Sequence, residues 1–158
     1  MRAFAVIVLS FFGISQTLAQ SGSLRPAYCP PGLVTTADAH LYLQPAYSIR
    51  LTSMNPSFSS AQWSLVPAEP YVKIVLAYSA GGQRAMTANG NINSAVTASK
   101  IDNSDSQLWT ASNPIGILWQ FVSKSTGLAL GSLGGGCAAQ TPMALVAQDG
   151  GTNWVWNQ

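Results

Sequence analysis

The chain has 158 residues, of which only 8% are charged, against about 25% in an ordinary soluble domain. With 47% hydrophobic residues and a formal net charge of +2, the composition excludes a disordered chain and gives no electrostatic reason to expect nucleic acid as a partner. One histidine and two cysteines are too few for a His-rich or Cys-rich metal centre, so neither a metal nor another cofactor is predicted.

The first 19 residues have the features of a secretory signal peptide. A short basic start precedes an apolar run from Ala3 to Ile14, which has the length of a signal core and is too short for a membrane span of about 20 residues. The small residues Thr17 and Ala19 suit cleavage after Ala19. The sequence therefore predicts a secreted, extracellular protein with a single domain over residues 20–158 and no membrane-spanning segment.

Cys29 and Cys137 are the two cysteines of the chain. An oxidising compartment favours a disulfide between them. This disulfide would close a loop of about 108 residues and stabilise the fold by roughly 4–5 kcal/mol in the chain-entropy model. Two unpaired buried thiols are the alternative.

A repeat runs through the predicted mature chain. Trp63, Trp109 and Trp156 are 46 and 47 residues apart, and each ends a similar passage of short apolar segments separated by turns of small residues. Each passage indicates four strands. In the first passage, strands are expected at 33–36, 41–43 and 48–53, with a fourth near Trp63. The three repeats cover approximately residues 33–67, 71–112 and 117–158.

Helices are not predicted. Gly, Pro, Ser, Thr and Asn interrupt the chain every few residues, and no window of a dozen residues keeps a 3.6-residue apolar period. Short strands at spacings of about 8–12 residues are typical of an all-β sandwich or barrel. Three equivalent four-stranded units can close around an axis with few exposed edges, so the repeat favours a barrel with pseudo-threefold symmetry and an inward layer of tryptophans.

Repeats of this length, each ending near a Gln-x-Trp, resemble the ricin B-type β-trefoil. Gln107-Leu108-Trp109 is a full match, while Trp154-Val155-Trp156 and Gln62-Trp63 keep part of the pattern. The resemblance implies a β-trefoil and a carbohydrate-binding function. In such lectins a carboxylate and an Asn or Gln exchange hydrogen bonds with vicinal hydroxyls, and an aromatic face covers the apolar side of the sugar ring.

The polar residues of each repeat differ in part from that pattern. The Asp of the family falls at Gln44, Thr87 and Gly131, and alanines stand near the place of the stacking aromatic. Other polar side chains remain as candidates for contact with a glycan. They are Asp102, Asn103, Asp105 and Gln107 in the second repeat, Asp149 and Asn153 in the third, and Gln44 in the first. The alternatives are ordinary turns and a purely structural Gln-x-Trp, in which Gln caps backbone groups and Trp fills the barrel.

Catalysis is not predicted. His40 is the single histidine, and the sequence has no His-Glu-x-x-His, Cys-x-x-Cys or Gly-x-Ser-x-Gly. The second function considered is a protein-binding trefoil, such as a secreted protease inhibitor, which presents loops from a rigid barrel. The loops considered are Asn89–Ser94 and Leu133–Pro142. The expected partner is therefore a glycan, or else a secreted protein such as a protease.

Overall fold

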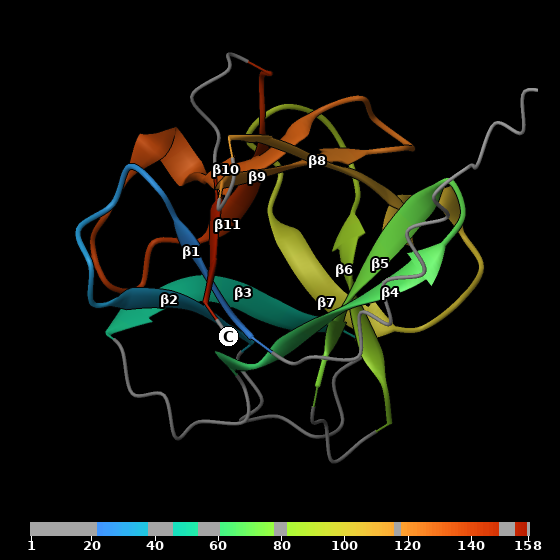
Figure 1. Ribbon diagram of the computed structural model, residues 1–158, viewed down its shortest axis with the longest axis horizontal. Coiled ribbons are helices and arrows are strands. Elements are labelled where there is room, and N and C mark those ends of the chain that lie inside the picture. The colour runs from blue at the N-terminus through green and yellow to red at the C-terminus, as the bar shows by residue number, and fades with distance from the viewer. Residues whose placement is uncertain are drawn as a thin grey trace, which may run out of the picture.

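The computed structural model describes residues 22–37, 46–53, 61–77, 82–115, 118–148 and 154–157 (Figure 1). Within these ranges the regular structure consists of β-strands and two short 3-10 helices, η2 (Asp105–Gln107) and η3 (Leu133–Gly135). The prediction of an all-β fold is confirmed. In this part of the chain no helix has the length and apolar character needed to cross a membrane.

In the described residues twelve strands form one sheet, and the pairings between them are antiparallel. They are β1 (Ser23–Pro26), β2 (Leu33–Ala37), β3 (Ala46–Ser53), β4 (Trp63–Ala68), β5 (Tyr71–Leu76), β6 (Arg84–Ala88), β7 (Val96–Lys100), β8 (Trp109–Ile115), β9 (Leu118–Ser123), β10 (Ala129–Ser132), β11 (Met143–Val146) and β12 (Trp154–Asn157).

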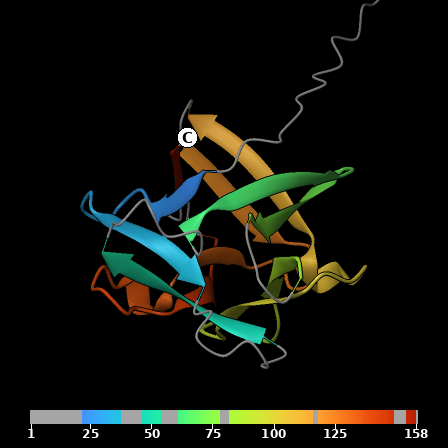
Figure 2. The same ribbon diagram turned by 90° about the horizontal axis from the view of Figure 1, so that it is seen from below.

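Six of these strands form a nearly closed barrel. Antiparallel pairs join β1 to β12, β12 to β9, β9 to β8, β8 to β5 and β5 to β4. Gly22 and Trp63 link the two ends of this row, because each backbone N–H donates to the other's carbonyl oxygen at 2.8 Å. Figure 2 shows the blue, green and orange segments of the ring around a common centre.

The remaining strands form three hairpins, β2–β3, β6–β7 and β10–β11. The hairpins contact one another. β3 pairs with β7, and single bridges join Arg50 to Pro142 and Ala95 to Ala144. The β10–β11 hairpin is thereby linked to both of the others. Alternation of apolar and polar residues explains how these strands bury one face, as in β3, where Tyr47, Ile49 and Leu51 are buried.

Three tryptophans occupy corresponding places in the core. Trp63, Trp109 and Trp154 are fully buried. Each indole N–H donates to a backbone carbonyl of β2, β6 or β10, so each buried ring keeps its polar atom satisfied. The acceptors are Thr35 at 3.2 Å, Met86 at 3.1 Å and Leu130 at 2.9 Å.

The third member of this set is therefore Trp154, which corrects the choice of Trp156 from the sequence. Trp63, Trp109 and Trp154 are 46 and 45 residues apart, so spacing alone does not separate two candidates that are two residues from each other. The burial of Trp154 and its hydrogen bond to Leu130 place it with Trp63 and Trp109. The side chain of Trp156 lies outside the described residues.

The first third of the chain differs from the expected strand order. β2 pairs with β3 from Leu33 opposite Ser53 to Ala37 opposite Ile49, so it is a hairpin strand, and β1 precedes it. The expected strand at 41–43 lies outside the described residues. β1 was missed because it has four residues, ends in proline and has a single large apolar side chain, Leu24, which is fully buried.

Candidate functional site

Three of the four predicted residues of the second repeat, Asp102, Asn103 and Asp105, lie together in one exposed loop, residues 102–106, which we call the 102–106 loop. It lies between β7 and β8 and ends with the first two residues of η2. Asp102, Asn103, Ser104 and Asp105 are exposed. Two carboxylates, one amide and two hydroxyl groups are therefore gathered in five consecutive residues, and these groups can exchange hydrogen bonds with the hydroxyls of a sugar.

Gln107 supports this loop from the interior. Its Oε1 accepts a hydrogen bond from the backbone N–H of Asp102 at 2.9 Å. Its Nε2 donates to the carbonyl oxygen of Lys100 at 2.8 Å and to Oγ1 of Thr87 at 3.3 Å. The side chain has no exposed surface, so a ligand does not reach Gln107, and the prediction that it contacts a glycan does not hold. Its contacts are those of the structural alternative, in which the Gln caps backbone groups.

Asp102 closes a tight turn at the start of the loop. Its Oδ1 accepts hydrogen bonds from the hydroxyl and the backbone N–H of Ser104, at 2.5 and 2.8 Å. These two bonds, with a smaller contribution from the charge of Lys73, hold the pKa of the Asp102 carboxyl below its ordinary value of 3.8. Lys73 Nζ donates to the Asp102 carbonyl oxygen at 2.8 Å. The carboxylate is therefore charged at neutral pH and fixed in place.

Asp105 is held by an ion pair at the other end of the loop. Its Oδ1 lies 2.7 Å from Nζ of Lys124, in the turn after β9. The hydrogen bond to Asp105 raises the pKa of Lys124 above its ordinary value of 10.5. The same ammonium group lies 5.0 Å from the centroid of the Tyr71 ring. The 102–106 loop is thus bordered by β5 and by the turn after β9, with an aromatic ring among its neighbours.

Two of the positions that match the Asp of the ricin B-type pattern are closed by packing. Thr87 is buried, and its hydroxyl donates to the carbonyl oxygen of Ala85 at 3.0 Å. At Gly131, an added Cβ would lie 2.6 Å from Cγ2 of Val146, so an aspartate has no room there. Gln44, the third such position, lies outside the described residues, as do the candidates Asp149 and Asn153.

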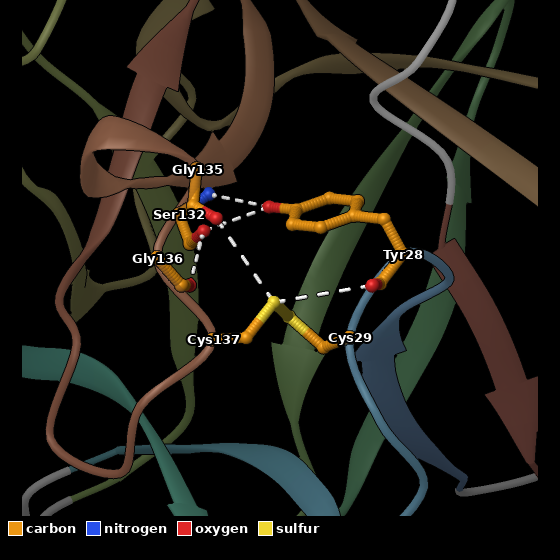
Figure 3. Close-up of a disulfide and its surroundings, with 6 residues drawn as sticks. All are labelled: Tyr28, Cys29, Ser132, Gly135, Gly136 and Cys137. Carbon is orange, nitrogen blue, oxygen red and sulfur yellow. Dashed lines mark hydrogen bonds between the residues drawn. A yellow bond between two sulfur atoms is a disulfide. The ribbon is translucent and has the colours of Figure 1, made fainter.

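Cys29 and Cys137 form the predicted disulfide, which joins the β1–β2 turn to the β10–β11 loop (Figure 3). Their Cα atoms are 5.3 Å apart. Tyr28, next to this disulfide, was missed by the sequence analysis. Its hydroxyl is hydrogen-bonded to Ser132, which is 104 residues away in the sequence, and no local pattern indicates such a contact.

The β6–β7 loop contains an exposed apolar side chain. Ile92 is 52% exposed. The loop is internally bonded, since the Asn91 N–H donates to Oγ of Ser94 at 3.0 Å and the Ser94 N–H donates to the carbonyl oxygen of Asn91 at 3.0 Å. The Asn93 N–H donates to the Leu145 carbonyl oxygen at 2.7 Å. Ile92 is thus presented on a compact turn fixed to β11.

Comparison with known proteins shows the fold. No protein-family model matches the chain, and no curated protein does. The designed threefold-symmetric protein ThreeFoil matches 87% of this chain and 98% of its own, with a TM-score of 0.74 and 16% identity. A proteinase inhibitor from Coprinopsis cinerea matches 87% of this chain and 96% of its own, with a TM-score of 0.64 and 12% identity.

A lectin from Polyporus squamosus matches 86% of this chain at 19% identity, with a TM-score of 0.62, and this chain spans 48% of the lectin's length. The three matched proteins are β-trefoils. At these identities the likeness shows the fold alone. The chain is therefore similar in fold both to a lectin and to a proteinase inhibitor.

Proposed function

We propose, from the β-trefoil fold and the 102–106 loop, that the protein is a secreted, non-catalytic carbohydrate-binding protein. The observation that carries the proposal is the anchoring of an exposed polar loop by a buried side chain. Gln107 fixes the backbone of Asp102, while Asp102 and Asp105 are fixed by Ser104 and Lys124. Polar groups held in place before binding lose little conformational entropy when a ligand binds.

The chemistry of the loop suits vicinal sugar hydroxyls. The carboxylates of Asp102 and Asp105 accept hydrogen bonds, and the amide of Asn103 both donates and accepts them. Lys73 and Lys124 balance the two carboxylates, which favours a neutral glycan over a charged one. The Tyr71 ring, half-buried on β5 with Lys124 over one face, is an aromatic neighbour of these polar groups.

We also propose that the twelve strands are three units of four, β1–β4, β5–β8 and β9–β12. The hydrogen bonds of Trp63, Trp109 and Trp154 to β2, β6 and β10 support this division. The 102–106 loop then belongs to the second unit, the one with the full Gln-x-Trp.

The test is calorimetric titration with a glycan that the secreted, oxidised protein retains on a broad array. Asp102→Ala, Asn103→Ala and Asp105→Ala are each expected to weaken binding about tenfold, the effect of losing one good polar contact. Asn91→Ala, an exposed amide in the β6–β7 loop, is the matched control and should bind like the wild type. Undiminished binding by all three folded variants would exclude the 102–106 loop.

Protein binding is the second candidate function, favoured by Ile92. An exposed large apolar side chain on a rigid loop can act as an anchor in a partner's pocket. The loop is a compact turn with Asn93 at a φ of 69°, rather than an extended segment, so it suits a surface contact better than insertion as a strand. If the protein inhibits a protease in a panel of papain-like and trypsin-like enzymes, Ile92→Asp should abolish the inhibition.

A further inference from the structure

Tyr28 is an exposed aromatic side chain whose hydroxyl is anchored to the protein. The residue is 42% exposed. The hydroxyl shares a hydrogen bond of 2.7 Å with Oγ of Ser132 and accepts one of 3.2 Å from the Ser132 N–H. Ser132 is itself buried, and its hydroxyl donates to the Gly136 carbonyl oxygen at 2.7 Å. The polar end of Tyr28 therefore faces the protein, and its exposed surface is mainly the apolar ring.

The disulfide fixes the base of the same side chain. Cys29 follows Tyr28 directly, and Sγ of Cys137 lies 4.0 Å from the Tyr28 carbonyl oxygen and 3.9 Å from that of Gly135. Figure 3 shows the Tyr28 ring extending across the disulfide toward Ser132. The ring is held at both ends, so a ligand that stacks on it meets a surface with little rotamer entropy to lose.

The backbone next to the ring is open. Gly134 and Gly135 have φ values of 63° and 69°, and an added Cβ on either would meet no atom within 4 Å. Leu133, the first residue of this Gly-rich turn, is 41% exposed. Peptide groups are thus accessible beside an apolar ring, which is the mixture of surfaces that a pyranose requires.

We propose that Tyr28 and the turn Leu133–Gly136 form a second saccharide site, in which one neutral pyranose stacks its C–H face on the Tyr28 ring and bonds to the glycine peptide groups. None of these side chains is charged, so the surface offers no partner for a carboxylate, sulfate or phosphate group. The ligand class is therefore a neutral glycoside.

The size of the surface favours a sugar over a protein. A stable protein–protein interface buries about 800 Å² on each partner. Of the exposed large apolar residues in the described part of the chain, Tyr28 and Leu133 belong to this surface, which suits a ligand of one ring better than a partner of that size. The site also stands apart from the 102–106 loop in the sequence and shares no residue with it, so it does not depend on the function proposed for that loop.

The test is an NMR titration of the full secreted protein with methyl β-galactopyranoside and methyl β-glucopyranoside, with sorbitol as the control. At millimolar concentrations both glycosides should shift the Tyr28 ring signals in a saturable manner, whereas sorbitol, an acyclic polyol without a ring face, should not. Absence of a saturable shift at Tyr28 with either glycoside, or an equal shift with sorbitol, would overturn the proposal.

Variants separate the stacking of the sugar on the Tyr28 ring from the anchoring of the Tyr28 hydroxyl to Ser132. Tyr28→Phe keeps the ring and loses the hydrogen bonds to Ser132, so it should weaken glycoside binding by a few fold. Tyr28→Ala should abolish it, and Asn91→Ala, a change of an exposed residue in the β6–β7 loop, should leave it unchanged. Should Tyr28→Ala not fold, Leu133→Gly replaces it, with a predicted loss of several fold. The site would be contradicted if the variants bound the methyl glycosides with the same affinity as the wild type. This applies to Tyr28→Phe together with the folded Tyr28→Ala or Leu133→Gly variant, and it holds whatever the 102–106 loop binds.

Discussion

Oε1 of Gln107 accepts a hydrogen bond from the backbone N–H of Asp102 at 2.9 Å, which joins the buried part of the second repeat to its exposed loop. The same amide holds the Lys100 carbonyl oxygen. One buried side chain therefore fixes the backbone where β7 ends and where the 102–106 loop begins. Gln107, the glutamine of the Gln-x-Trp pattern, thus supports the candidate site from the interior and is not part of its surface.

Gln107→Ala should lower the free energy of unfolding by about 2–4 kcal/mol, because the Asp102 N–H and the Lys100 carbonyl lose their partner. Urea unfolding measures this change. The control is Gln140→Ala, which removes an exposed hydrogen bond to Arg50 and should cost less than about 0.5 kcal/mol. Equal costs for the two variants would show that Gln107 does not support the loop.

Trp63→Phe, Trp109→Phe and Trp154→Phe should destabilise the protein to a similar extent. Each leaves a buried carbonyl oxygen without the indole donor that it has now, at a cost of about 1–3 kcal/mol for the lost hydrogen bond, to which the smaller ring adds a cavity. Thermal and chemical unfolding of the three variants under one set of conditions gives the comparison. A position that tolerates phenylalanine without loss would break the proposed equivalence.

The double variant Cys29→Ser/Cys137→Ser should lose up to about 4–5 kcal/mol of stability, because the disulfide closes a loop of 108 residues in the unfolded chain. Guanidinium unfolding of the variant and of the oxidised wild type measures this loss, provided that the free energy of unfolding depends on guanidinium concentration with the same slope in both proteins. The reduced wild type should match the double variant. A reduced protein as stable as the oxidised one would refute this role of the disulfide.

The carboxyl of Asp102 should titrate below its ordinary pKa of 3.8, chiefly because of the hydrogen bonds from Ser104. A pKa lowered by folding means that this contribution to stability is present above the unfolded pKa and is lost as the pH falls through the folded one. Ser104→Ala should move the pKa back toward 3.8, as followed by NMR of the side-chain carboxyl carbon. An unchanged pKa in that variant would contradict the assignment.

The ion pair between Lys124 and Asp105, at the other end of the loop, should lose its stabilising effect only at alkaline pH. The raised pKa of Lys124 keeps the ammonium charged beyond its ordinary value of 10.5, so its contribution is present below that value and is lost as the pH rises through the folded pKa. Asp102 and Lys124 are both charged between about pH 5 and 9, so glycan affinity should stay constant over that range. A steep change in affinity near neutral pH would point to other titrating groups.

The sequence predicts the strands where the apolar pattern is strong and local. The strand expected at 33–36 lies within β2 (Leu33–Ala37), and the strand expected at 48–53 lies within β3 (Ala46–Ser53). β1 escapes because pairing with β12 and the burial of Leu24 make it a strand, and neither is visible in four residues that end in proline. Trp154 is likewise identified by its hydrogen bond to the distant Leu130 carbonyl oxygen, which spacing in the sequence does not indicate.

For the candidate site, too, the sequence predicts the residues that are adjacent in the chain and misses those that folding brings together. The cluster Asp102–Asp105 can be read from the sequence because its residues are adjacent. The burial of Gln107 and the contacts of Lys73 and Lys124 cannot, because those lysines come from other strands and turns. Tyr28 depends on a disulfide and a serine more than a hundred residues away, so only the folded chain identifies it.

The most direct measurement is a broad glycan array probed with the oxidised wild type and with an Asp102→Ala/Asp105→Ala double variant shown to be folded. The account predicts specific retention of the wild type on neutral glycans and loss of that retention in the double variant. A blank array from folded wild type, or a double variant that binds the same glycans equally well, would contradict carbohydrate binding by the 102–106 loop.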